Sequence, residues 1–209
     1  MLVLMTYIIP VFALIPVHGL VQLGSNAGRS FVQRDHVNWS VAGRFLAGAL
    51  VGGIASFFFV VQIDETVLRI ILGLFILIMI WAKLPKFKNP GLLPLGGALT
   101  TFASMFVGAT GPLVAVFLNR LFDDHKTIVA THGMTMTVQH GLKLVVFGFA
   151  GFAFADWLPL IALMVLSGFA GTKAGTYFMN KTPESALKWL FKIVLTVSAL
   201  DLLRRGLFA

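Results

Sequence analysis

Two apolar stretches of this chain carry polar side chains at helical spacing. In the first stretch these side chains lie at i, i+4, i+7 and i+11, which places them on one face of a helix: His18, Gln22, Ser25 and Arg29. Asn26 lies alongside them. An unpaired polar group in lipid costs several kcal/mol, so these side chains must face protein or water. Amide, hydroxyl and imidazole groups of this kind can bind a small oxyanion.

The second stretch repeats this pattern at positions 132, 136, 139 and 143. Its polar face holds His132, Gln139 and Lys143, and the neighbouring polar residues are Thr131, Thr135 and His140. Neither stripe contains a carboxylate, which argues against a cation site. Any single Ser or Thr could instead hydrogen-bond a neighbouring helix and hold the bundle together. Arg29 and Lys143 are interpreted as side chains that snorkel from helix ends.

A small-residue break, Gly108-Ala109-Thr110-Gly111-Pro112, interrupts the apolar segment from Leu92 to Leu118. Two glycines and a proline in five residues cannot continue a regular helix. In a bilayer such a break is tolerated only where it is buried in protein or lines a cavity. Discontinuous helices mark the binding sites of transporters. We therefore expect substrate contacts at Gly108, Thr110 and Gly111, with the polar stripes closing around them.

The composition indicates an integral membrane protein. The chain is 58% hydrophobic and 11% charged, whereas a soluble domain has roughly a quarter of its residues charged. The net charge of +8 comes from basic residues at the ends of apolar segments, so nucleic-acid binding is not expected. The chain has no cysteine, and Asp123, Asp124 and His125 are adjacent in a charged turn and cannot converge on a metal. No cofactor is predicted.

The sequence predicts an all-α membrane domain spanning 1–209, with about seven to eight hydrophobic segments of ~20 residues. A polar linker at 83–91 divides it into one half of about 1–82 and another of about 92–209. We expect this linker to be cytoplasmic because of its lysines. The predicted segments are Leu2–Val17, Val17–Phe31, Trp39–Val61, Thr66–Ala82, the broken Leu92–Leu118, Thr127–Gly148, Trp157–Asn180 and a last helix from Glu184 to about Arg205.

The two halves are predicted to be homologous repeats with broken helices at the midplane. His18-Gly19 matches His132-Gly133, and a ladder at Gly48, Gly52 and Ser56 matches one at Ser167, Gly171 and Gly175. The small-residue ladders are expected to pack closely against other helices. The distribution of basic residues favours an inverted arrangement. Pro10 would then correspond to Pro112, and the first half-helix of the first repeat would be absent.

The polar motifs resemble those of the TauE/SafE (sulfite-exporter-type) membrane transporters. The similarity is carried by the run from His18 to Arg29, by His36-Val37-Asn38-Trp39, by Gly108 to Pro112, and by Gln139 to Lys143. The resemblance implies a multi-pass protein of the bacterial inner membrane, built from two repeats of four segments. It also implies movement of sulfite, sulfoacetate or related organosulfur anions.

These observations predict a secondary transporter, and more specifically an exporter, of a small organosulfur or sulfite-like anion. Its partners are the anion and the lipid bilayer, and whether it forms a homo-oligomer is left open. One alternative is a non-transporting membrane subunit or assembly factor. Another is an intramembrane enzyme with His132 or His140 as general base, but the sequence lacks the paired carboxylate, cysteine nucleophile or metal cluster that such an enzyme uses. The predicted substrate-binding residues are His18, Gln22, Ser25, Asn26, Gly108, Thr110, Gly111, Thr131, Thr135, Gln139 and His140.

Overall fold

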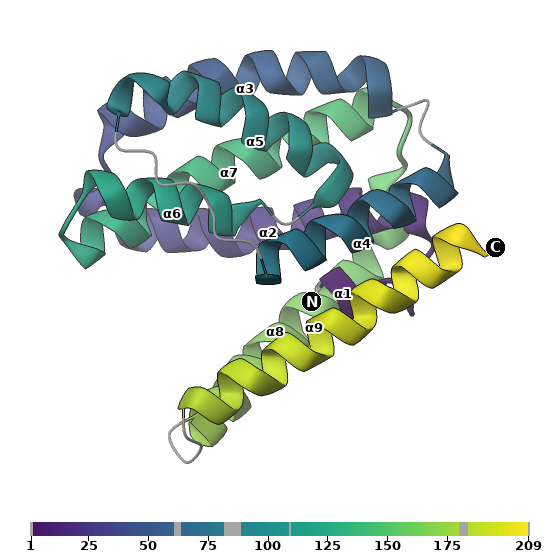
Figure 1. The fold of residues 1–209 in the computed structure, drawn as a ribbon. Helices are drawn as coiled ribbons and strands as arrows, with labels where there is room; N and C mark the ends of the chain where they lie inside the picture. Colours follow the sequence, from purple (N-terminus) through teal and green to yellow (C-terminus); the bar gives the residue numbers. More distant parts are fainter. Residues whose placement is uncertain (1, 61–63, 82–88, 109, 180–183, 209) are drawn as a thin grey trace.

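A computed structural model describes residues 2–60, 64–81, 89–108, 110–179 and 184–208, and the regular structure in these ranges is helical (Figure 1). The first half contains α1 (Leu2–Met5), α2 (Val11–Val32), η1 (Arg34–His36), α3 (Trp39–Val60) and α4 (Glu65–Trp81). The second half contains η2 (Pro90–Leu92), α5 (Leu93–Val107), α6 (Gly111–Leu121), α7 (His125–Phe149), η3 (Phe154–Trp157), α8 (Leu158–Met179) and α9 (Glu184–Leu207).

Most helices begin and end close to the predicted positions, and the clear exception is the N-terminal pair. The sequence predicted a division at Val17, which is wrong, because α2 runs without interruption from Val11 to Val32 and contains Pro16. The break falls instead at Pro10, whose backbone is extended (φ −58°, ψ 147°). Pro10 directly precedes the polar helix α2, whereas Pro112 opens the separate helix α6. The predicted equivalence of these two prolines is therefore not reproduced in the order of the elements.

The described helices expose much apolar surface. One of them, Trp39–Val60, is long and apolar enough to cross a membrane, and shorter apolar stretches lie at Thr66–Ile78, Leu93–Val107, Gly111–Leu121 and Phe154–Gly168. Large exposed apolar patches mark interaction surfaces in proteins, and here the expected partner is lipid. The exposed side chains on α3 and α9 include Leu50, Val51, Ile54, Phe58, Leu190, Ile193, Val197 and Leu200.

Glycines allow the backbones of α3 and α5 to pack in direct contact. A Cβ placed on Gly48 would lie 1.7 Å from the Pro94 carbonyl oxygen, and one on Gly52 would lie 2.1 Å from that of Ala98. From the other side, a Cβ on Gly97 would lie 2.3 Å from the Phe45 carbonyl oxygen. The predicted use of the Gly48/Gly52 ladder for close helix packing is thus confirmed. Through it, the half-helix α5 is fixed to a helix of the first half of the chain.

Substitution of Gly48 by Ala is expected to destabilise the protein strongly, because the two backbones must separate to admit the methyl group. Overpacking of this kind costs about 1–3 kcal/mol, and more where backbone must move. The measurement is thermal unfolding in detergent. The matched control is Gly43→Ala on the same helix, where a Cβ would meet nothing within 4 Å. Equal melting temperatures for the two variants would contradict the packing described here.

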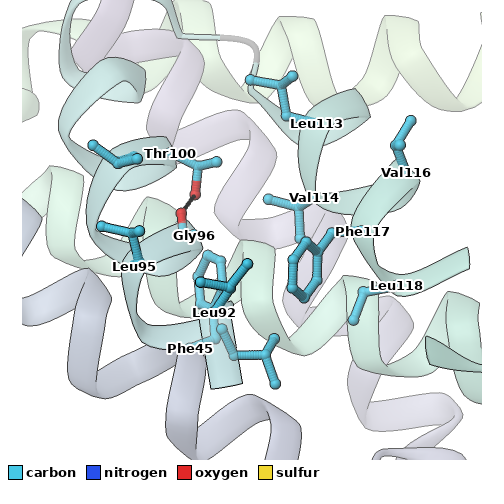
Figure 2. Close-up of a pocket in the computed structure, with 12 residues that line it drawn as sticks. Phe45, Leu92, Leu95, Gly96, Thr100, Leu113, Val114, Val116, Phe117 and Leu118 are labelled. Carbon is cyan, nitrogen blue, oxygen red and sulfur yellow. Dashed lines mark hydrogen bonds between the residues drawn. The ribbon is translucent and has the colours of Figure 1, made fainter. Parts of the chain in front are cut away.

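An apolar pocket of about 230 Å³ lies between α5, α6 and Phe45 of α3 (Figure 2). Its walls are made by Leu92, Leu95, Leu113, Val114, Val116, Phe117 and Leu118, with Gly96 and Thr100 on α5. The Thr100 hydroxyl donates a hydrogen bond to the Gly96 carbonyl at 2.6 Å, so it is satisfied within its own helix. This pocket offers a small anion neither charge nor free donors, and we do not assign the substrate to it.

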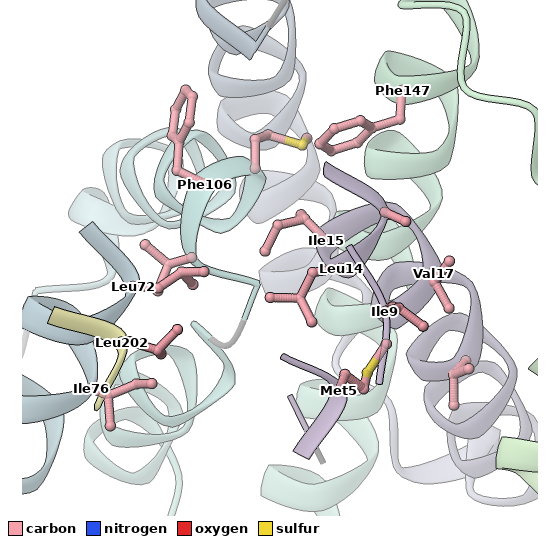
Figure 3. Packing of buried hydrophobic residues seen from close by; sticks show 14 of the residues in the cluster. Met5, Ile9, Leu14, Ile15, Val17, Leu72, Ile76, Phe106, Phe147 and Leu202 are labelled. Carbon is pink, nitrogen blue, oxygen red and sulfur yellow. The ribbon is translucent and has the colours of Figure 1, made fainter. Parts of the chain in front are cut away.

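The main core lies where helices from both halves meet (Figure 3). A second close approach, between α4 and α9, supports it: a Cβ on Gly73 would lie 2.9 Å from the Ala199 carbonyl oxygen, and one on Gly206 would lie 3.2 Å from that of Thr66. The carboxyl-terminal part of α8 and the amino-terminal part of α9 extend away from the other helices, while the rest of α9 packs against α4 (Figure 1). The buried cluster includes Met5, Ile9, Leu14, Ile15, Val17, Leu72, Ile76, Phe106, Phe147 and Leu202.

Candidate functional site

The predicted helix break is present between α5 and α6. Helix α5 ends at Val107 and α6 begins at Gly111, while Ala109 lies outside the described residues. Gly108 adopts φ +76°, a conformation that a residue with a side chain adopts only under strain. The carboxyl end of α5 therefore meets the amino end of α6 at this point. Peptide dipoles place partial negative charge at the first end and partial positive charge at the second.

Helix α7 holds the break through three side chains. The Gln139 amide donates one hydrogen bond to the Thr110 hydroxyl and another to the Thr100 carbonyl at 3.2 Å. The Lys143 ammonium donates to the Gly108 carbonyl at 3.5 Å. His132 Nε2 lies 3.0 Å from the Gly111 carbonyl oxygen, and a carbonyl accepts only, so this nitrogen carries a proton. Both sides of the break are thus tied to one helix.

A polar cavity of about 360 Å³ opens beside the break, between α2 and α7. Imidazole, amide and guanidinium groups supply its polar lining, and no carboxylate of the described residues takes part. Donors without acid groups favour an anion over a cation. The residues that line the cavity are His18, Gln22, Asn26, Arg29, Gly108, Gly111, Pro112, Ala115, His132, Met136 and His140.

His18 of α2 and His140 of α7 lie next to each other in the wall of this cavity. Their rings are 6.0 Å apart, edge to face, and their exposed fractions are only 2% and 4%. The Nδ1 atom of each ring is buried and has no hydrogen-bond partner. His18 Nε2 lies 3.5 Å from the Gln22 amide nitrogen. Buried polar atoms are rarely left unpaired, which makes these two nitrogens candidate ligand contacts.

Of the predicted binding residues, six line the cavity and two support it from behind. The supporting pair is Thr110 and Gln139, which bond to each other and are about as buried as a side chain can be, at 1% and 0% exposure. Their position behind the lining fixes the shape of the cavity wall. The six that line the cavity are His18, Gln22, Asn26, Gly108, Gly111 and His140.

Three predicted binding residues do not line the cavity. Ser25 is exposed on another face of α2, because Asn26 rather than Ser25 continues the row from His18 and Gln22. The Thr131 hydroxyl accepts a hydrogen bond from the Asn38 backbone at 3.0 Å. The Thr135 hydroxyl donates to the His132 carbonyl at 3.0 Å. Thr131 and Thr135 therefore hydrogen-bond within the bundle, which is the alternative role that the sequence analysis gave for any single Ser or Thr.

The interpretation of Lys143 as a snorkelling residue is wrong. Its side chain is 0% exposed and passes beside Gly19 of α2, where an added Cβ would lie 2.8 Å from Lys143 Cδ. Among the described residues no carboxylate pairs with its ammonium group. Arg29 is exposed and reaches the cavity, as a side chain near a helix end can. The side chain of Lys173, another intramembrane charge in the sequence, lies outside the described part of the chain.

Five lining residues were not among the predicted binding residues: Arg29, Pro112, Ala115, His132 and Met136. Arg29 belongs to the polar face of the first stretch. His132 and position 136 already belonged to the polar-face pattern, and Pro112 belonged to the break. Only Ala115 gives no sequence signal, because it is one of several small apolar residues on α6. The spacing of His132, Met136 and His140, four residues each, shows which face of α7 is turned toward the cavity.

The acidic turn before α7 caps a helix. The Asp124 carboxylate accepts hydrogen bonds from the backbone of Lys126 and Thr127 and from the Thr127 hydroxyl. These bonds, that from the Thr127 hydroxyl first, lower the pKa of the Asp124 carboxyl. Within the described ranges, no three His, Asp or Glu side chains gather as metal ligands. The turn positions α7, which in turn carries the side chains of the break.

A bundle of helices that holds a polar cavity against a broken helix has the architecture of a membrane transporter. Comparison with known families agrees. The family model for the sulfite exporter TauE/SafE matches residues 1–202, and the chain belongs to this family of membrane transporters. No curated protein and no solved structure matches the chain.

Proposed function

We propose that this chain is a secondary transporter that exports a small organosulfur or sulfite-like anion, and that the anion binds in the polar cavity beside the break. The observation that carries the proposal is the lining of this cavity, which joins imidazoles, amides and one guanidinium to the start of α6 without an acid group. Such a set of donors suits an oxyanion with several acceptor atoms.

Charge supports the same assignment. The amino end of α6 begins at Gly111 in the cavity wall, and a helix amino end attracts anions. Arg29 lines the cavity, and the buried Lys143 lies directly behind Gly108. An anion in the cavity would therefore meet positive potential from α2, α6 and α7 together.

The break supplies a place where the cavity can open to either side. A secondary transporter moves its substrate by rearranging helices around a site near the membrane midplane. The half-helices α5 and α6 end at this site and are held there by hydrogen bonds rather than by continuous backbone helix. We propose that exchange of these hydrogen bonds accompanies the change of access, in the inner membrane of a bacterium.

The direct test is flux by the purified chain in proteoliposomes, preceded by a thermal-shift screen of sulfite, thiosulfate, sulfonates and carboxylates. We expect one or more sulfur oxyanions to raise the melting temperature of the protein, and we expect the protein to export the same anion. A well-folded wild-type chain that binds and moves none of these anions would overturn the proposal. That result would favour the alternative of a non-transporting membrane subunit.

Replacement of His140 by Ala is expected to weaken anion binding by about tenfold or more, because one lost charge-assisted hydrogen bond contributes about 1.5–3 kcal/mol. His140 lines the cavity and has a buried nitrogen without a partner. The measurement is isothermal titration with the anion found in the screen. Ser25→Ala is the matched control, since Ser25 is exposed outside the cavity. Equal weakening by both substitutions would contradict the site assignment.

A further inference from the structure

We infer that His18 and His140 together form a proton-binding site that is filled when the anion binds, an inference that rests on the proposed transport function. Each ring has one buried nitrogen without a hydrogen-bond partner, and the rings face each other in the wall of the same cavity. Imidazole is the side chain that ordinarily takes up and releases a proton between about pH 5 and 8.

The chemistry is a proton transfer and nothing more. A proton from water adds to the lone pair of one imidazole nitrogen; no other bond forms or breaks, and release of the proton reverses the step. Because the rings lie edge to face, 6.0 Å apart, two positive charges on the pair would repel each other. The pair therefore takes up one proton as a unit.

The charged groups around the pair determine when it binds a proton. His132 of α7 and Arg29 of α2 line the same cavity, and Lys143 of α7 lies behind Gly108, while α5 and α6 contribute no titratable side chain to the lining. The remaining charges on neighbouring described elements lie away from it. Asp156 of η3 lines a separate cavity, and Arg69 of α4 packs beside Gly206. The other charged side chains are exposed: Arg34, Asp35 and His36 of η1, Arg44 of α3 and Arg120 of α6.

The empty cavity thus opposes protonation of the pair, because every charged neighbour that lines or backs it is basic. A bound anion offsets this positive potential and favours the protonated pair. By linkage, the proton must then raise the affinity for the anion by the same factor. Anion and proton therefore bind together, and a cycle that carries both moves less net charge across the membrane than the anion alone.

The experiment measures proton uptake when thiosulfate or sulfoacetate is added to the full chain in weakly buffered detergent solution. Both anions keep a constant charge between about pH 6 and 8, so uptake reports on the protein. The expected result is up to about one proton taken up per anion bound. The affinity of the wild-type chain should also rise as the pH falls, by at most about tenfold per pH unit for one linked proton.

Variants identify the groups that bind the proton. In the double variant His18→Gln/His140→Gln, the number of protons taken up per anion bound is expected to fall to near zero. If this variant binds no anion, the pH dependence of the wild-type affinity still tests whether a proton binds together with the anion. His36→Gln is the matched control, because His36 is exposed on η1 outside the cavity, and it should retain uptake.

The outcomes separate this inference from the proposed function. Anion binding without proton uptake, or an affinity that does not vary with pH, overturns the proton site and leaves anion transport standing. Uptake that persists in the double histidine variant overturns the assignment to His18 and His140. Failure of the wild-type chain to bind any anion overturns both the inference and the proposed function.

Discussion

Replacing Gln139 by Leu is expected to reduce anion flux by about tenfold or more. The Gln139 amide holds the Thr110 hydroxyl and the Thr100 carbonyl, one on each side of the break, and its side chain is 0% exposed. Leu fills a similar volume but leaves these buried groups without their partner. Each unsatisfied group costs about 1–3 kcal/mol. The start of α6 should then lose its fixed position in the cavity wall.

The measurement is flux of the identified anion in proteoliposomes, together with thermal unfolding of the same preparation. Thr137→Val is the matched control on α7, because the hydrogen bond described for the Thr137 hydroxyl goes to the Gly133 carbonyl of its own helix, at 2.8 Å. The control should retain wild-type flux. Full flux in Gln139→Leu would show that the hydrogen bonds across the break do not shape the site.

Replacing Lys143 by Met is expected to separate stability from function. A buried charge costs several kcal/mol of desolvation, and removal of a buried ionic group in favour of an apolar one of similar size is often neutral or stabilising by about 1–4 kcal/mol. The one hydrogen bond described for the ammonium, to the Gly108 carbonyl, is long at 3.5 Å. We therefore expect an unchanged or higher melting temperature for Lys143→Met.

Anion affinity should fall in the same variant. Two unit charges at a separation of about 8 Å interact by on the order of 2 kcal/mol at an effective dielectric constant of about 20. Loss of the Lys143 charge from behind the cavity wall should therefore lower the affinity by about tenfold or more. Lys126→Met is the control, because Lys126 is exposed in the first turn of α7 and is screened by solvent. A Lys143→Met protein that unfolds more easily yet binds the anion normally would contradict this role.

The positions of most helices and of the helix break could be predicted from the sequence. Long apolar segments bounded by charged turns leave little choice of helix position, and two glycines with a proline cannot form regular helix. The division near Val17 failed because polar residues beginning at His18 suggested a new segment. In the structure those residues belong to one continuous helix, which begins after Pro10 and contains Pro16.

The phase of the polar faces was harder to predict, because it depends on where neighbouring helices lie. Ser25 and Asn26 are adjacent, and only the position of α7 decides that Asn26 faces the cavity. Gln139 and His140 are adjacent too, and they divide between the break and the cavity. The depth of Lys143 could not be inferred from its distance to the helix end, because Gly19 of another helix makes the space for its stem.

The glycine contacts also have a consequence for the order in which the chain can complete its fold during synthesis. Gly48 of α3 can pack against α5 as soon as α5 has been synthesised. Gly73 of α4 can pack against its partner only when Ala199 and Leu203 of α9 have been synthesised. Until then α4 has no close helix to cover its glycine. The packing of α4 is therefore completed only by the last described helix, and a chain released before α9 is made is expected to expose this face of α4 to proteases.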